Sequence, residues 1–303
     1  MQDYNPAKVA EQITELIQKE YKELKNLNVM ILGKTGVGKS TLVNNMFSEK
    51  LAETGVGKPV TDKIHQLSKP DYPLTIFDTP GLELDGENAV DSLLDDVVGE
   101  IQKGIGSGDN NKAIHCIWYC IATPSHRFEQ AEIDFLNKFL EKTSDCKVPV
   151  IFVLTQSYSK KDAQKLKLEI EKENLPVVNI IPVLAEDYDI YEYYTAKAYG
   201  LDVLSEVMNS VIPEAVQKTF IAVQCANLAL KKKKAQAVVG ASSAAAAATG
   251  AVPIPFSDAA LLVPEQISML AGITGAFGIP MEQATMVAIL SATIGTAGTT
   301  ILG

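Results

Sequence analysis

Between residues 29 and 41 the chain reads Val29-Met-Ile-Leu-Gly-Lys-Thr-Gly-Val-Gly-Lys-Ser-Thr41. This stretch fits the pattern G-x-x-x-x-G-K-[S/T], which is typical of a loop that binds phosphate groups. An apolar run of strand type precedes it at 27–32, and apolar residues at helical spacing follow it at 41–47. Strand, glycine-rich loop and helix in this order predict a loop that surrounds a phosphate, with the positive end of the helix directed toward it.

The residues of this loop have distinct expected roles. Lys39 is expected to contact the β- and γ-phosphates as a point charge, and the Ser40 hydroxyl is expected to bind Mg²⁺. The remaining contacts are expected from the loop as a whole. The predicted phosphate-binding residues are Gly33, Lys34, Thr35, Gly36, Val37, Gly38, Lys39, Ser40 and Thr41.

Composition limits the class of protein. A length of 303 residues allows a nucleotide-binding domain and a smaller second part. The net charge of −10 argues against a general nucleic-acid binder, which needs a basic surface. Four cysteines, Cys116, Cys120, Cys146 and Cys225, lack a disulfide or metal-ligand pattern. We therefore expect a reduced, cytoplasmic chain. Residues 1–25 carry charges throughout, so we expect no secretory signal.

Apolar strand-like runs alternate with amphipathic helical patterns from residue 27 to about 212. The expected strands are 27–32, 64–69, 73–78, 113–121, 148–154 and 178–183, and the expected helices are 39–47, 87–103, 128–142, 160–173 and 201–212. This alternation predicts an α/β three-layer sandwich with a mostly parallel sheet. Ligands of such sheets bind at the carboxyl ends of the strands, where every motif discussed here falls.

A second motif, Thr75-Ile-Phe-Asp-Thr-Pro-Gly81, ends one of these strands. Asp78 at the strand tip is expected to hold the hydration shell of Mg²⁺, directly or through water. Gly81 can offer its N–H to a γ-phosphate without a side chain in the way. The D-x-x-G tetrapeptide is common in turns, but its place after a strand and downstream of a phosphate loop favours a nucleotide site.

Residues 48–63, between the two motifs, are polar and rich in glycine, which predicts a loop. Because the segment has little apolar surface to hold it, bound γ-phosphate and Mg²⁺ would decide whether it is ordered. Thr61 is the threonine that we expect to close on Mg²⁺, and Thr54 is the reserve choice. A plain surface loop is the alternative interpretation.

The residues at 33–41, Thr61 and the motif at 78–81 together resemble the GTPases of the translation-factor-related (TRAFAC) class. The phosphate loop is especially similar to that of the septin-like and immunity-associated GTPases, which pair through their nucleotide faces. The resemblance covers residues 27–212. It implies a P-loop GTPase fold, binding of GTP or GDP with Mg²⁺, a GTP/GDP conformational cycle and a homodimer through the nucleotide face.

The chain departs from this class in residues that serve hydrolysis. Leu82 follows the D-x-x-G motif, where small GTPases of the class place a glutamine that orients water, so slow hydrolysis is expected. Gly36 stands where potassium-dependent members have asparagine, which argues against potassium as a catalytic ion. A side chain from a second protomer is another source of catalytic help. His126 and Arg127, in the loop at 124–128, are the nearest candidates, although both also fit an ordinary surface role.

A second departure concerns the base. The class reads guanine with Asn/Thr-Lys-x-Asp, but here Gln156 replaces the lysine and Tyr158 stands in the aspartate position. A carboxylate that accepts two hydrogen bonds from guanine rejects adenine, so an ATP-using member stays an alternative. Asp162 is near in sequence, but it falls at a helix start, where an acidic residue is expected anyway. The predicted base-binding residues are Thr155, Gln156, Leu184 and Ala185.

The last part of the chain differs in composition. Four lysines at 231–234 precede a stretch of 69 residues in which only Asp258, Glu265 and Glu282 are charged. Three interpretations stay open: a bundle of small-residue helices, a hairpin on or in a membrane with the lysines at the headgroups, and a disordered tail. Residues 283–303 are uncharged and long enough to span a bilayer, but they are only weakly hydrophobic.

Two segments of this tail, 253–258 and 261–266, are similar to an uncharacterised Ala/Gly-rich domain found behind the GTPase domain of many bacterial proteins. That resemblance implies a bacterial source, and a domain that normally continues past Gly303. We therefore expect an N-terminal helix at 1–26, a GTPase domain at 27–214 and a helical C-terminal domain at 215–303, truncated at its end.

These observations predict a GTP-binding switch that hydrolyses GTP slowly and is activated by dimerisation or by a partner. Its helical tail would attach to a partner protein or to the inner face of a membrane. The alternatives are a nucleotide-gated scaffold with negligible turnover and an ATP-using enzyme of the same fold. The three histidines, His65, His115 and His126, show no spacing typical of metal ligands.

Overall fold

The computed structural model describes residues 6–51, 56–61, 64–79, 87–125, 127–191, 194–250 and 258–278. The chain divides into two compact units. One unit spans Lys25–Asn227, and the other combines Met1–Leu24 with Leu228–Gly303.

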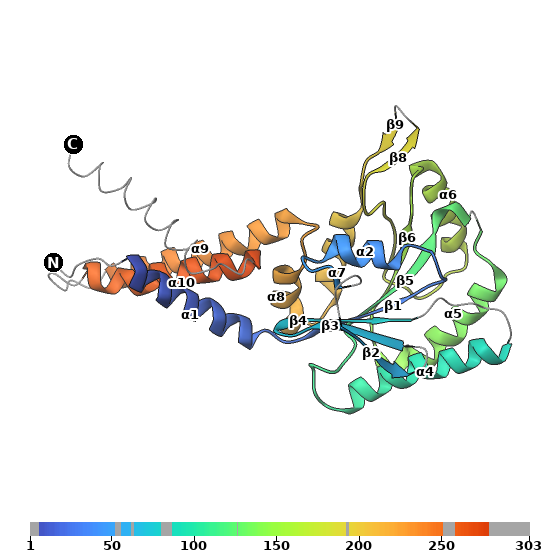
Figure 1. The fold of residues 1–303 in the computed structure, drawn as a ribbon, viewed down its shortest axis with the longest axis horizontal. Helices are drawn as coiled ribbons and strands as arrows, with labels where there is room; N and C mark the ends of the chain where they lie inside the picture. The colour runs from blue at the N-terminus through green and yellow to red at the C-terminus, as the bar shows by residue number, and fades with distance from the viewer. Residues whose placement is uncertain are drawn as a thin grey trace. The chain divides into compact units, whose positions relative to one another are not determined.

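The larger unit is built on a seven-stranded sheet with the order β2-β3-β4-β1-β5-β6-β7 (Figure 1). The strands are β1 (Leu27–Leu32), β2 (Val56–Thr61), β3 (Ile64–Lys69), β4 (Tyr72–Asp78), β5 (Cys116–Ala122), β6 (Val150–Thr155) and β7 (Asn179–Pro182). β4, β1, β5, β6 and β7 pair in parallel, while β2 and β3 continue the sheet antiparallel at one edge. The predicted mostly parallel α/β sheet is therefore confirmed.

Helices cover both faces of this sheet. They are α2 (Lys39–Met46), α4 (Glu87–Gly106), α5 (Gln130–Thr143), α6 (Lys160–Lys172), α7 (Leu201–Val211) and α8 (Glu214–Val223). α4, α5 and α6 pack on one face, over a core that includes Met30, Tyr119 and Phe152. On the other face the buried Trp118 stacks on Phe47, just after α2, with ring centroids 5.8 Å apart. Continuous apolar strands are buried because both faces of the sheet are covered.

The expected loop at 48–63 is wrong for residues 56–61, which form the edge strand β2. β2 pairs antiparallel with β3, from Val56 opposite Ser68 to Thr61 opposite Ile64. Gly57 and Pro59 disfavour a strand in general, but an edge strand tolerates them because one side needs no ladder hydrogen bonds. The hairpin of β8 (Tyr188–Tyr191) and β9 (Tyr194–Ala196) is a further element that the sequence analysis did not assign.

The smaller unit consists of helices in its described part: α1 (Pro6–Glu23), α9 (Leu228–Gly250) and α10 (Asp258–Phe277). α10 packs against both α1 and α9. A Cβ atom on Gly272 would lie only 2.9 Å from Cγ1 of Val238, so small residues let α9 and α10 approach closely. Lys231, the first of the four lysines, is buried and donates a 2.7 Å hydrogen bond to the Phe277 carbonyl at the end of α10.

Among the described residues, no helix has the length and hydrophobicity needed to cross a membrane. The uncharged segment at 283–303 lies outside the described residues. In its described residues, the tail consists of the two helices α9 and α10.

Candidate nucleotide-binding site

The predicted phosphate-binding residues, 33–41, form the connection from β1 into the first turn of α2. Gly33, Gly36 and Gly38 adopt positive φ angles of 142°, 76° and 88°, which only glycine reaches without strain. Lys39 folds back over this loop, and its Nζ donates hydrogen bonds to the carbonyl oxygens of Gly33 at 2.9 Å and Lys34 at 3.1 Å. The loop is thus shaped with a positive charge held against it, as phosphate binding requires.

Asp78 ends β4 beside this loop, because β4 pairs in parallel with β1 and Asp78 lies opposite Ile31. Its Oδ1 atom is buried and has no hydrogen-bond partner in the described part of the chain. Burial raises the pKa of Asp78, although the charges of Lys39 and His65 act in the opposite direction. A buried carboxylate oxygen without a donor fits the hydration shell of Mg²⁺, and the Ser40 hydroxyl at the start of α2 is a second oxygen ligand of the kind that Mg²⁺ takes.

The γ-phosphate side of the site is described only in part, at the backbone of Thr61. Thr61 ends β2, where its backbone pairs with Ile64, but its side chain is outside the described residues. Gly81 and Leu82 also lie outside them. Their roles stay predictions.

We expect Asp78→Asn to stabilise the ligand-free protein at neutral pH while weakening Mg²⁺-dependent nucleotide binding by about 10–100-fold. Burial raises the pKa of Asp78 above its ordinary value of 3.8, so the folded state holds this proton more tightly than the unfolded chain. The free energy of unfolding therefore falls as the pH rises from 3.8 through the raised pKa, and asparagine removes that loss.

Chemical unfolding in EDTA across this pH range, and Mg²⁺ titration of nucleotide binding, measure the two effects. Asp71→Asn is the matched control, because Asp71 is exposed and its left-handed turn position suits asparagine. Equal Mg²⁺ dependence in wild type and Asp78→Asn would contradict the assignment.

The predicted base-binding residues at the end of β6 form hydrogen bonds to the phosphate loop. The buried Thr155 hydroxyl can donate its hydrogen bond to either of two carbonyl oxygens, that of Val37 at 2.5 Å or that of Ile121 at 3.1 Å. Gln156, in a left-handed backbone conformation, donates from Nε2 to the Gly36 carbonyl at 2.9 Å. Gln156 thus contacts the phosphate loop although it replaces the lysine of the family motif.

A small cavity of about 90 Å³ lies between these segments. Its walls come from the phosphate loop and α2 (Gly38, Thr41, Leu42), from the end of β6 and the residues after it (Thr155, Gln156, Tyr158), and from the stretch between β7 and the start of β8 (Val183, Leu184, Ala185, Glu186, Tyr188). The structure therefore brings all four predicted base-binding residues together. The sequence analysis missed Glu186 and Tyr188. The aromatic, β-forming run at 188–191 was an available signal for Tyr188, and no short motif marks Glu186.

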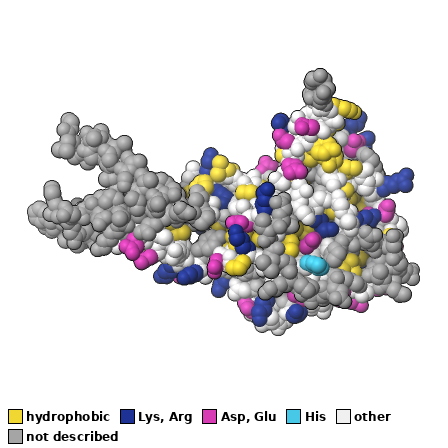
Figure 2. Space-filling model, in the orientation of Figure 1, with side chains coloured by type: hydrophobic (Ala, Val, Ile, Leu, Met, Phe, Trp, Pro, Cys, Tyr) yellow, Lys and Arg dark blue, Asp and Glu magenta, His cyan; other side chains and the backbone are white. Residues whose placement is uncertain are grey.

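An aromatic pair stands at this cavity. The rings of Tyr158 and Tyr188 lie 4.2 Å apart between centroids and are tilted by 40°. Figure 2 shows hydrophobic and acidic side chains side by side over the region of the β8–β9 hairpin. Tyrosine in the position of the family aspartate thus contributes a ring surface to the cavity.

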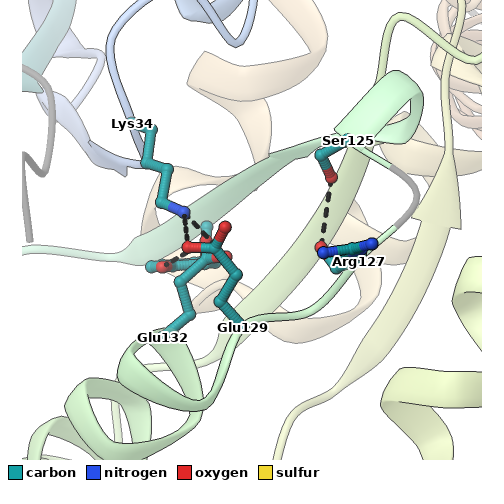
Figure 3. A network of polar contacts seen from close by, with 6 residues as sticks. Lys34, Ser125, Arg127, Glu129 and Glu132 are labelled. Atoms are coloured by element: carbon teal, nitrogen blue, oxygen red, sulfur yellow. Dashed lines mark hydrogen bonds and ion pairs between the residues drawn. The ribbon is translucent and has the colours of Figure 1, made fainter.

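A charged cluster ties the phosphate loop to the start of α5 (Figure 3). Nζ of Lys34 lies 2.7 Å from Oε2 of Glu129 and 3.2 Å from Oε2 of Glu132. Glu132 is buried and accepts a hydrogen bond from the Tyr119 hydroxyl at 3.3 Å. Burial alone would lower the pKa of Lys34, but the two carboxylates outweigh it and the pKa is raised. Lys34 therefore stays charged and fixes the loop to α5.

We expect Glu132→Ala to lower the free energy of unfolding by about 1–3 kcal/mol, because it leaves the buried Tyr119 hydroxyl without its acceptor. Glu129→Ala should change stability little, since Glu129 is exposed and its pair with Lys34 is screened by solvent. Urea unfolding of the two variants makes the comparison. Equal losses in both would show that burial of Glu132 does not matter.

A phosphate loop after β1, an aspartate at the tip of the neighbouring strand and a base pocket after β6 and β7 define a P-loop GTPase fold. The family model described as "50S ribosome-binding GTPase" matches residues 28–182, so the chain belongs to that family. It therefore contains a GTP-binding GTPase domain.

Two known proteins are similar to part of this chain. The chain is 30% identical over 193 residues to the chloroplastic GTPase ERA1 of Zea mays, covering 61% of this chain and 40% of the relative. It is 27% identical over 177 residues to Septin-1 of Drosophila melanogaster, covering 52% of this chain and 48% of the relative. The chain thus spans less than half the length of these two relatives.

Solved structures with a similar fold include Era in complex with MgGDPNP and a segment of 16S ribosomal RNA, at 22% identity and a TM-score of 0.39, covering 63% of this chain and 58% of that one. Toc33 of Arabidopsis thaliana with Mg²⁺ and GMPPNP is 18% identical, with a TM-score of 0.37, and covers 72% of this chain and 94% of that one.

Proposed function

We propose that this protein is a GTP-binding switch that hydrolyses GTP slowly by itself. One observation carries the proposal: three features lie together at the carboxyl ends of the parallel strands. They are the phosphate loop, the buried Asp78 Oδ1 atom that has no hydrogen-bond partner among the described residues, and the base cavity. Lys39 and the backbone N–H groups of the loop would hold the phosphates. Ser40, Asp78 and Thr61 would hold Mg²⁺, which supplies neutralisation of the phosphate charge.

Hydrolysis needs a group that orients the attacking water, and Leu82 lacks a polar side chain for this task. We infer that a second protomer, paired through the nucleotide face, or another partner supplies that group. Arg127 supports this inference because it is exposed in the loop that follows β5, at the end of the sheet that carries the phosphate loop. His126 of the same loop lies outside the described residues.

The nucleotide state would act on the segments at 48–63 and 79–90, and through them on a second protomer or on the helical unit. We propose that the GTPase domain covers 27–214, and that residues 215–303 attach the protein to a partner or to the inner face of a membrane. The exposed Lys232 and Lys233 on α9, and the close packing of α9 and α10, are the features that support an attachment domain.

The test is titration of the purified chain with fluorescent GTP and ATP analogues in Mg²⁺, with phosphate release measured at rising protein concentration. GTP-selective binding and turnover that rises with protein concentration support the proposal. Binding without turnover at any concentration would instead indicate a nucleotide-gated scaffold, the function that Leu82 favours. Equal binding of both nucleotides would indicate an ATP-using enzyme, and no binding would refute the proposal.

A further inference from the structure

We propose that Glu186 is the carboxylate that selects guanine in this protein, in place of the aspartate that the family motif has at the position of Tyr158. The inference rests on the proposed nucleotide site and names the residue that reads the base there. Among the described residues that line the base cavity, Glu186 is the only acidic one. It is exposed and makes no hydrogen bond or ion pair to any other described residue.

The neighbouring carboxylates are already engaged elsewhere. Asp162 forms an ion pair with Lys165 at 3.2 Å on α6 and does not line the cavity. Asp187 pairs with Lys197 at 2.8 Å and accepts the Ala198 N–H, also at 2.8 Å. Asp189 accepts the Thr195 hydroxyl within the hairpin. Glu186 is therefore the carboxylate in this region that is available to bind a ligand in the cavity.

The backbone fixes Glu186 from both sides. On its N-terminal side, Leu184 exchanges two hydrogen bonds with Tyr199, at 3.0 and 2.9 Å. On its C-terminal side, Asp187 is held by Lys197 and the Ala198 N–H. The hydroxyl of Tyr199 also donates to the Ser157 carbonyl at 3.0 Å, which ties this segment to the one that follows β6. The short span around Glu186 is thus positioned beside the cavity rather than left as a free loop.

The aromatic pair adds a surface on which a base can stack. The rings of Tyr158 and Tyr188 lie 4.2 Å apart, and both residues line the cavity. Burial raises the pKa of Tyr158, and the nearby Tyr188 and negative Glu186 raise it further. Tyr158 therefore stays a neutral ring. Stacking of a base on such a ring contributes about 1–3 kcal/mol and does not depend on which base is present.

Selectivity then depends on the edge of the base. An ionised carboxylate only accepts hydrogen bonds. Guanine offers two adjacent donors, its N1–H and its amino group, which match two carboxylate oxygens. Adenine presents a ring-nitrogen acceptor in that position, so it would leave the carboxylate unpaired and repel it. Glu186 should therefore favour GTP over ATP.

The test is Glu186→Gln, with the affinities for GTP, XTP and ATP measured by competition against a fluorescent GTP analogue. Glutamine keeps the acceptor for N1–H but turns the second oxygen into an amide donor, which matches the oxygen that xanthine carries in place of the amino group. We expect GTP affinity to fall about 10–100-fold, because a charged hydrogen-bond partner is lost. We also expect XTP affinity to rise, so that XTP becomes the preferred nucleotide.

The control is Asp162→Asn, which should leave all three affinities unchanged. Selective GTP binding by the wild type that survives Glu186→Gln would overturn the assignment of Glu186 and leave the proposed function intact. A change of preference in Asp162→Asn, or equal binding of GTP and ATP by the wild type, would also overturn it. Failure of the wild type to bind any nucleotide would refute the proposed function and this inference together.

Discussion

Lys39→Ala is expected to weaken GTP binding by about 100–1000-fold and to abolish measurable turnover. The ammonium group is the cation that the phosphate loop holds against its own carbonyl oxygens, those of Gly33 and Lys34. Loss of one partner from a hydrogen-bonded charge pair costs about 2–5 kcal/mol, and the expected loss of affinity, about 3–4 kcal/mol, lies within this range. The fold should persist, because the helix that begins at Lys39 is held by buried residues such as Leu42 and Val43.

Isothermal titration with GTP in Mg²⁺ measures the affinity, and a thermal unfolding curve of the same sample checks the fold. Lys112→Ala is the control, because Lys112 is exposed and precedes β5 at the opposite end of the sheet from the phosphate loop. Its affinity for GTP should equal that of the wild type. A folded Lys39→Ala variant that binds GTP normally would show that the loop does not bind phosphates.

The structure places the predicted phosphate loop and Asp78 beside each other, and the sequence could predict this arrangement because the motifs are local. The residues at 33–41 and the strand that ends at Asp78 each lie within a few positions of one another, and each carries its own mechanism. The buried strands could also be predicted from the sequence. β5, at 116–122, is apolar throughout and almost fully buried, so hydrophobicity alone marks it.

Thr155, Gln156, Leu184 and Ala185 were predicted for the base half of the site, but Glu186 and Tyr188 were not, because their place at the cavity depends on contacts between distant residues. Glu186 is positioned by the pairing of Leu184 with Tyr199, which no short motif encodes. Lys34 meets Glu132 across 98 positions of sequence. β2 was missed for a related reason: Pro59 argues against a strand until the partner strand β3 shows that β2 lies at the edge.

Gly33→Ala is expected to lower the free energy of unfolding by about 3–5 kcal/mol, the sum of backbone strain and overpacking. A Cβ atom at this position would lie 2.5 Å from the carbonyl oxygen of Cys120, and the φ angle of +142° is one that alanine rarely adopts. The clash is with backbone of β5, a buried central strand, so the phosphate loop must move instead. Because Lys39 donates to the Gly33 carbonyl, that movement should also weaken GTP binding.

Gly36→Ala separates the two causes. Gly36 has a φ angle of +76°, but a Cβ atom there would meet nothing within 4 Å. Only the backbone strain applies, so the loss should be about 1–2 kcal/mol. Urea unfolding of the two variants, read with GTP affinity, makes the comparison. If both lose the same stability, contact with Cys120 does not constrain the loop. If Gly33→Ala loses more stability than Gly36→Ala, the first position of the motif requires glycine because the backbone of β5 at Cys120 leaves no space for a side chain there.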